Sequence, residues 1–419
     1  MYFWYQFLTY LFYPFSKVYL FCRKLNKKEH PIRYKEKLSD INIDRDNGFL
    51  VWFHVVSVGE GLSILPLVEN FKNDKKVDKI LITTITLSSA EVLQKRLIEN
   101  EKVIHQFLPL DIPIFVKKFL NHWSPNLAIF VDSEIWPNII FAIKERSIPL
   151  LLINARITKK TFKKWQLFKN FSKKIFQKFD LCIVSNNETE IHLKTLGAEN
   201  IKNYGNLKFA NTETKTNNSL DIKYLNKIGD RKIWCAASTH SSEEIFCAKT
   251  HLLLKKKYDD ILTIIIPRHI DRIERIKSEL EKLNLKTCLY SKFDEINVKT
   301  DILLIDAYGE SSKFFSMAKY VFLGGSLIKH GGQNPIEASR LGCKIFHGPN
   351  IDNFFEIYEY LKSLKIANQI YNSEELNQSL VEEFKLEKVD NNQIIEKIDN
   401  YGKNILNNVI NDLKKYINI

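Results

Sequence analysis

Residues 51–61 read Val51-Trp52-Phe53-His54-Val55-Val56-Ser57-Val58-Gly59-Glu60-Gly61. The first half of this stretch is apolar and rich in β-branched residues, so it predicts a buried strand. A turn of small residues follows, and apolar residues at helical spacing over 62–71 predict a helix. We expect the turn between them to lie at the carboxyl edge of a parallel sheet, where open α/β sheets bind ligands.

Glu60 lies in that turn, close to backbone N–H groups and to the positive end of the predicted helix. These neighbours favour an ionised carboxylate, and an ionised carboxylate that faces a crevice can act as a general base. The local pattern fits simple capping of the helix at least as well. Both interpretations therefore stay open at this point.

The composition limits the classes of protein to which the chain can belong. The 419 residues suffice for two or three domains, and a hydrophobic content of 45% is ordinary for a protein with a large core. Lys and Arg outnumber Asp and Glu by 62 to 49, and this net charge of +13 suggests nucleic acid, a phospholipid surface or a phosphorylated substrate as partner. The six cysteines show no C-x-x-C spacing and the ten histidines no H-E-x-x-H pattern. We therefore expect reduced core cysteines and no metal site.

Residues 1–22 are dense in aromatic side chains and are followed by a basic flank. They lack the basic start and the cleavage site of a secretory signal. Pro14 and Lys17 interrupt the run of roughly 20 apolar residues that a spanning helix needs, whereas Tyr and Trp suit the headgroup zone. We predict that residues 1–46 form a membrane-associated segment and linker with the basic flank on the cytoplasmic side. Whether the segment spans the bilayer or lies in its interface stays open, and an ordinary amphipathic helix packed on the domain is the alternative.

Predicted strands alternate with helices in two successive stretches, residues 47–210 and 231–419, and the second ends in helices. Residues 211–230, rich in Asn, Thr and Lys, predict a linker. The predicted strands are 50–55, 80–84, 127–131, 150–153 and 181–184, then 233–237, 261–266, 286–290, 302–305, 320–323 and 344–347. This rhythm predicts an α/β fold with two doubly wound domains, and a ligand site is favoured in a cleft between them.

Polar residues follow several predicted strands of the first stretch. The run 132–138, Asp-Ser-Glu-Ile-Trp-Pro-Asn, places two acids one residue apart beside Trp and Pro. Glu134 is suited to bind sugar hydroxyls or to position Glu60, although capping of the next helix fits as well. The hydroxyl-rich run 83–91 suits an oxyanion or phosphate, or forms a plain helix start.

Residues 156–178 contain nine basic residues and no acid, interleaved with Phe and Trp. On a helix, this spacing puts aromatic rings on one side and lysines on the other. Such a helix suits an anionic membrane surface or a phosphorylated lipid, and equally nucleic acid. A solvated Lys face over a buried aromatic stripe is the third interpretation.

The strand ends of the second stretch carry groups that suit phosphate and ribose. Arg268 can grip a phosphate with its planar fork. The pairs Gly324-Gly325 and Gly331-Gly332 let backbone amides approach phosphates. Asn334 can cap a helix whose N-terminus faces the anion, and Glu337 can accept from ribose hydroxyls. Each signal alone fits an ordinary turn, but together they favour a nucleotide site.

Several runs, in this order, resemble the Kdo (3-deoxy-D-manno-octulosonic acid) transferases of lipopolysaccharide synthesis. The runs are residues 57–60, 132–138, 154–156, 205–209, 237–240, 267–269 and 331–337. The resemblance covers residues 1–365. It implies a GT-B glycosyltransferase with two Rossmann-like domains that face a cleft. It also implies inverting, metal-independent transfer of Kdo from CMP-Kdo to a lipid A precursor (lipid IVA), without a cofactor, at the cytoplasmic face of the inner membrane.

The resemblance also implies roles for single residues. Glu60 matches the general base of the family, which deprotonates the lipid sugar hydroxyl, and Glu134 joins it as a catalytic residue. The CMP-binding positions are Pro267, Arg268, Tyr308, Gly309, Glu310, Asn334, Pro335, Ile336 and Glu337. The positions that line the donor and acceptor cleft are Gly59, Lys208, Ser238, Thr239, His240 and Gly325. The chain departs from the family pattern at Asp132, Tyr308 and Gln333, where Glu, Met and His are usual.

The expected partners are therefore CMP-Kdo, a lipid A precursor and the anionic lipid surface of the inner membrane, with no nucleic acid. One alternative is another GT-B transferase that moves a different nucleotide sugar, such as UDP-GlcNAc, to a membrane lipid. A nucleic-acid-binding protein would explain the charge but not Glu60. A membrane scaffold without activity is the third alternative, and it predicts that Glu60 can be replaced without loss.

Overall fold

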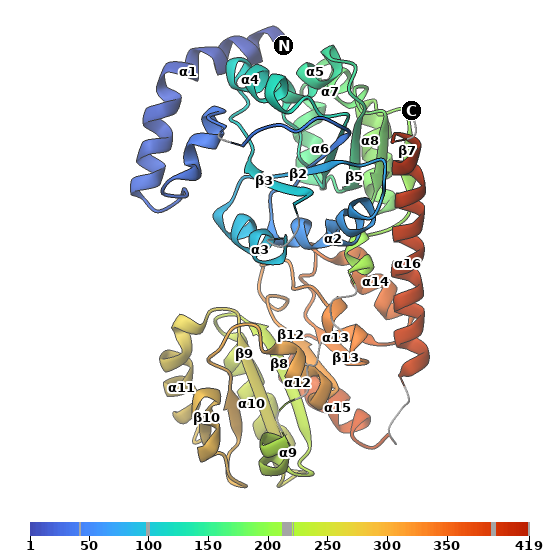
Figure 1. Ribbon diagram of the computed structural model, residues 1–419. Coiled ribbons are helices and arrows are strands. Elements are labelled where there is room, and N and C mark those ends of the chain that lie inside the picture. The colour runs from blue at the N-terminus through green and yellow to red at the C-terminus, as the bar shows by residue number, and fades with distance from the viewer. Residues whose placement is uncertain (42, 98–100, 212–219, 221, 387–390, 418–419) are drawn as a thin grey trace. The chain divides into compact units, whose positions relative to one another are not determined.

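The computed structural model describes residues 1–41, 43–97, 101–211, 220, 222–386 and 391–417. The chain forms two compact units, residues 1–211 with 402–419, and residues 212–401. Within the described residues, each unit is built on one sheet of seven parallel strands with helices packed on it (Figure 1). The predicted α/β class with two doubly wound units is confirmed.

The first unit has the strand order β3-β2-β1-β4-β5-β6-β7. Its strands are β1 (Leu50–His54), β2 (Lys79–Thr84), β3 (Val103–Phe107), β4 (Leu127–Val131), β5 (Leu150–Ala155), β6 (Leu181–Val184) and β7 (Ile201–Asn203). The central strands β1, β4 and β5 are buried along their whole length, as parallel strands covered on both faces must be. The order reverses between β1 and β4, which predicts that a ligand binds at their carboxyl ends.

Helices and short 3₁₀ turns connect these strands. They are α1 (Tyr2–Leu25), η1 (Arg33–Leu38), α2 (Val58–Lys72), α3 (Leu87–Leu97), α4 (Pro113–Trp123), α5 (Pro137–Glu145), α6 (Lys159–Gln166), α7 (Lys169–Phe176), α8 (Asn187–Leu196) and η2 (Leu207–Ala210). The aromatic N-terminal segment is the helix α1, which packs beside α4 (Figure 1). Among the helices of the described residues, α1 included, none combines the length and the apolar character needed to cross a bilayer.

The second unit has the strand order β10-β11-β9-β8-β12-β13-β14. Its strands are β8 (Ile233–Thr239), β9 (Leu262–Pro267), β10 (Thr287–Leu289), β11 (Ile302–Leu304), β12 (Tyr320–Leu323), β13 (Lys344–His347) and β14 (Ala367–Gln369). Its helices are α9 (Ile222–Ile228), α10 (Glu243–Lys255), η4 (Ile270–Arg272), α11 (Ile273–Glu281), η5 (Tyr290–Glu295), α12 (Ser311–Ala318), α13 (Ile336–Arg340), α14 (Phe355–Ser363) and α15 (Ser373–Glu383). Here the order reverses between β8 and β12, so the turns after these strands meet at the edge where a ligand is expected.

The helix α16 (Asn392–Lys415) begins in the second unit and ends in the first. Near its end, the Asp412 carboxylate accepts hydrogen bonds from Lys202 Nζ and Tyr204 OH, both at 2.7 Å. Residues 402–419 therefore group with the first unit, whereas the sequence analysis placed all of 231–419 in one domain. Within the predicted linker 211–230, residues 212–219 and 221 lie outside the described part of the chain.

Candidate active site

Glu60 lies in the first turn of α2, next to the carboxyl end of β1. Ser57 is the N-cap of this helix and accepts from the Glu60 N–H at 3.2 Å. In return, Ser57 Oγ donates to Glu60 Oε1 at 2.7 Å, and the Val56 N–H donates to Oε2 at 2.8 Å. The bond from the Glu60 N–H to Ser57 Oγ is the N-cap half of the S-x-x-E capping box, whereas the Glu60 side chain reaches back to the N–H of Val56, one residue before the cap. Because a carboxylate has about four lone-pair sites, the two bonds orient Glu60 and still leave it able to accept a proton.

Lys208, on η2, lies next to Gly59, the residue before Glu60. Asn154 and Asn206 hold η2 in place, because their side-chain oxygens accept from the N–H groups of Leu207 (2.8 Å) and Lys208 (3.0 Å). A Cβ atom added at Gly59 would lie 3.8 Å from Lys208 Cε and 4.0 Å from Nζ. The structure therefore brings together Gly59, Glu60 and Lys208, which the sequence analysis placed in one cleft.

Glu134 follows β4, the strand next to β1. Its Oε2 accepts from Trp136 Nε1 at 2.9 Å and lies 3.6 Å from His54 Nε2. His54 is fully buried at the end of β1, and its Nδ1 lies 2.9 Å from Thr83 Oγ1. These contacts hold Glu134 next to His54 at the carboxyl end of β1, the strand that leads into the turn of Glu60.

Asp132, which directly follows β4, joins this group. Burial, and after it the negative charge of Glu60, raises the pKa of Asp132 to about 6, while Lys208 and Arg156 act in the opposite direction. Its backbone is left-handed, with φ of 63°. Asp132 was noted as one of two neighbouring acids at a strand end and as a departure from the family pattern, but it was not predicted as a site residue. The available signal was the pair of acids one residue apart at a strand end.

We expect Asp132→Asn to stabilise the protein at pH 8 and to lose this advantage below about pH 4. The raised pKa means that the folded state disfavours the ionised carboxylate, so wild type loses stability as pH rises from 3.8 to about 6. Asn carries no charge and tolerates left-handed backbone. Thermal unfolding should give a gain of about 2–4 °C at pH 8, roughly 1 kcal/mol for a unit of this size. A pH-independent difference would contradict the assignment.

In the second unit, the buried Glu243 carboxylate ties the turn after β12 to the turn after β8. Its Oε2 accepts from the N–H groups of Gly325 (2.7 Å) and His240 (2.9 Å), and its Oε1 accepts from those of Ser326 (3.1 Å) and Leu327 (3.0 Å). A Cβ at Gly324 would lie 2.5 Å from the carbonyl oxygen of Ser238. The glycine pair therefore permits close approach of two backbone segments, and the Gly325 amide donates to Glu243.

His240 lies in a cluster of basic side chains at this edge. The rings of His330 and His269 lie 4.3 and 5.9 Å from its ring, centroid to centroid. Burial lowers the pKa of His240 to about 4, and its neighbours His330, His269, Arg268 and Arg272 add to the effect. Such a cluster suits an anion. Arg268 and His240 were predicted, whereas His269, His330 and Arg272 were missed, although His269 directly follows Arg268.

The other predicted site residues of the second unit, for the nucleotide and for the cleft, follow its strands or lie near the start of α13. Thr239 Oγ1 donates to Glu244 at 3.1 Å, and Glu244 also pairs with Arg272. Tyr308 is 63% exposed beside Gly309, and Glu310 accepts from Tyr290 OH at 3.3 Å. Asn334 Oδ1 accepts from the Ile336 N–H at 3.2 Å, and Pro335 and Ile336 are buried at the start of α13. Burial raises the pKa of Glu337, which bonds to Ser312.

Comparison with known proteins identifies the family. A family profile described as 3-deoxy-D-manno-octulosonic-acid transferase (kdotransferase) matches residues 28–211. The 3-deoxy-D-manno-octulosonic acid transferase of Rickettsia bellii is 36% identical over 372 residues, which cover 89% of this chain and 88% of that protein. The chain belongs to the Kdo transferase family. A probable mitochondrial 3-deoxy-D-manno-octulosonic acid transferase of Arabidopsis thaliana is 33% identical over 87% of this chain and 83% of its own length.

Solved structures agree on the fold. A glycosyltransferase from Rickettsia africae superposes with a TM-score of 0.56 at 13% identity, over 89% of this chain and 99% of that one. A putative UDP-N-acetylglucosamine 2-epimerase from Listeria monocytogenes gives 0.62 at 12% identity, over 89% and 97%. At these identities the likeness concerns the fold alone, and together with the two parallel sheets it supports the GT-B class for this Kdo transferase family member.

Proposed function

We propose that the protein transfers Kdo from CMP-Kdo to a lipid A precursor, lipid IVA, with Glu60 as general base. The observation that carries this proposal is the Glu60 carboxylate, oriented by Ser57 and the Val56 N–H, in a chain of the Kdo transferase family. Lys208 lies next to the preceding residue, Gly59. A carboxylate on a strand-to-helix turn, held by two donors and partly exposed, meets the geometric needs of a base.

The proposed reaction is a single displacement without a metal ion. Glu60 accepts the proton of the acceptor hydroxyl, whose oxygen then bonds to the anomeric carbon of Kdo. The bond from that carbon to the CMP phosphate oxygen breaks, its electron pair leaves with CMP, and the configuration inverts. The negative charge that develops on the phosphate needs fixed positive groups, a role for Arg268, which lies near His240. Glu134 would hold the acceptor sugar through a hydroxyl.

We place this reaction at the cytoplasmic face of the inner membrane. The surface of α1 exposes large apolar side chains, including Phe3 (69%) and Trp4 (62%). Between α6 and α7, the apolar Leu167 and Phe168 are also exposed, in a lysine-rich segment that contains no acid. An apolar, aromatic face next to positive charge suits an anionic lipid surface.

Incubation of the purified protein with CMP-Kdo and tetraacylated lipid A precursor should give a lipid product heavier by one or more Kdo units in mass spectrometry. Excess CMP should inhibit the transfer, and UDP should not, because we assign the site in the second unit to CMP. Transfer from UDP-GlcNAc, with none from CMP-Kdo, would contradict the proposal and establish a different GT-B activity.

A further inference from the structure

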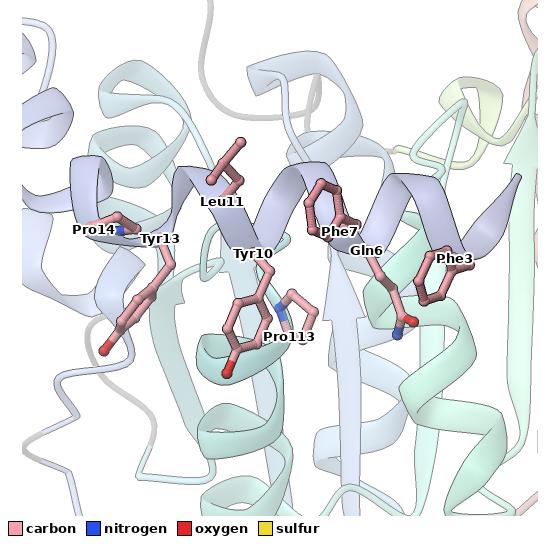
Figure 2. A pocket seen from close by; sticks show the side chains of 8 residues that line it. All are labelled: Phe3, Gln6, Phe7, Tyr10, Leu11, Tyr13, Pro14 and Pro113. Atoms are coloured by element: carbon pink, nitrogen blue, oxygen red, sulfur yellow. The ribbon is translucent and has the colours of Figure 1, made fainter.

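An apolar groove of about 610 Å³ runs along α1 on the side of α4. In Figure 2, the rings of Tyr10 and Tyr13 point from the helix toward the side of Pro113, the first residue of α4. Phe3, Phe7 and Leu11 line the rest of the groove. Aromatic and proline side chains with few polar groups form the kind of wall that holds a hydrocarbon ligand.

The groove has a fixed shape, because specific contacts hold α1 on the first unit. Tyr5 OH donates to the buried Asp111 at 2.8 Å, and Asn138 Nδ2 donates to Thr9 Oγ1 at 3.0 Å. The rings of Tyr13 and Phe115 lie 5.3 Å apart, centroid to centroid. Tyr5 and Thr9 alternate along α1 with residues that line the groove, and Tyr13 belongs to both sets, so the helix is anchored while the groove stays open.

The same contacts connect the groove to the candidate active site. Asp111 accepts from the N–H groups of Asn138 (3.1 Å) and Ile139 (2.8 Å), in the first turn of α5. That helix directly follows Trp136, whose indole N–H holds Glu134. The start of α5 therefore positions both α1, which forms the wall of the groove, and Glu134, which we assign to the acceptor sugar.

Lysine side chains lie close to the start of α1, the helix that forms the groove. Tyr2, at the start of α1, stacks on Phe141 with 3.8 Å between ring centroids, and Lys178 Nζ lies 5.3 Å from the centre of the Phe141 ring. Tyr5 also contacts Phe171 of α7, a helix that carries three lysines. Residues 1–28 contain no acid. The combination fits a ligand with a hydrocarbon chain and an anionic head.

We propose that this groove holds one acyl chain of the phosphorylated acceptor lipid, with the lysines of α7 and Lys178 near its phosphate. The inference rests on the proposed function, and it makes α1 part of the acceptor site in addition to a membrane anchor. A bilayer lipid would satisfy the same chemistry, but the shared positioning of the groove and Glu134 favours the acceptor.

The test compares Phe7→Ala with Phe21→Ala in the full-length protein in detergent. The two side chains lie on the same helix and are equally exposed, at 51% and 49%, but only Phe7 lines the groove. With tetraacylated acceptor, Phe7→Ala should raise KM about tenfold, the effect of losing one well-buried aromatic contact. With the fully deacylated acceptor its KM should stay at the wild-type value, and Phe21→Ala should change neither. Equal effects of both variants, or equal effects on both acceptors, would overturn the proposal.

A binding experiment separates failure of the groove from failure of the proposed reaction. A tetraacylated lipid A precursor with a diazirine on one acyl chain should crosslink to peptides of residues 1–14 and of Pro113, even where no Kdo is transferred. Phosphatidylglycerol with the same diazirine should crosslink at least tenfold less at equal concentration. Crosslinks elsewhere, or equal labelling by both lipids, would remove the acceptor from the groove.

Discussion

Replacement of Glu60 with Gln is expected to lower kcat by about 10²–10⁴-fold, the usual contribution of a general base. The amide keeps the size of the carboxylate and also suits a capping box, because Gln at this position can accept from the N-terminal N–H. The free energy of unfolding should therefore change by less than about 1 kcal/mol. Initial rates of Kdo transfer and thermal unfolding, measured on the same preparation, separate the two effects.

Ser57→Ala is the matched control, because it removes the N-cap that bonds to Glu60 but leaves the carboxylate. It should cost about 1 kcal/mol of unfolding free energy and lower kcat less than Glu60→Gln does. If the two variants lost the same activity in proportion to their stability, Glu60 would be a helix cap and nothing more.

The predicted strands that the structure reproduces are those with continuous apolar runs. Residues 127–131 and 181–184 were predicted with the observed bounds of β4 and β6. Three strands at or near the sheet edges, β3, β7 and β14, were missed. Edge strands are short and partly solvated, and β3 carries His105 and Gln106 within five residues, so their periodicity does not rise above that of a loop.

The residues of the candidate site also divide into those that the local sequence indicates and those that it does not. Glu60, Glu134 and Lys208 follow predicted strands or lie in a distinctive run, and local sequence therefore indicated them. Glu243 looked like an ordinary acid at a helix start, yet it bonds to amides 82 to 84 residues away. Such contacts follow from the order of strands in the sheet, which local patterns do not contain.

Glu243→Ala should destabilise the second unit by about 3–5 kcal/mol, because it leaves four N–H groups, three of them buried, without an acceptor. That loss corresponds to a decrease of roughly 10 °C in the unfolding temperature of the unit. The turn that it releases carries Gly325, and a Cβ there would lie 3.2–3.3 Å from Gln333, His240 and His330. CMP affinity should therefore fall together with stability.

Two further variants isolate the cause. Glu243→Gln keeps one acceptor oxygen but turns a donor toward the same amides, so its unfolding temperature should lie between those of wild type and Glu243→Ala. Glu274→Ala removes an exposed acid from the first turn of α11 and should change stability by less than about 0.5 kcal/mol. If Glu243→Ala behaved like Glu274→Ala in thermal unfolding and CMP titration, water molecules would be accepting the hydrogen bonds of the four amides in place of the carboxylate. The carboxylate would then not hold the two turns together.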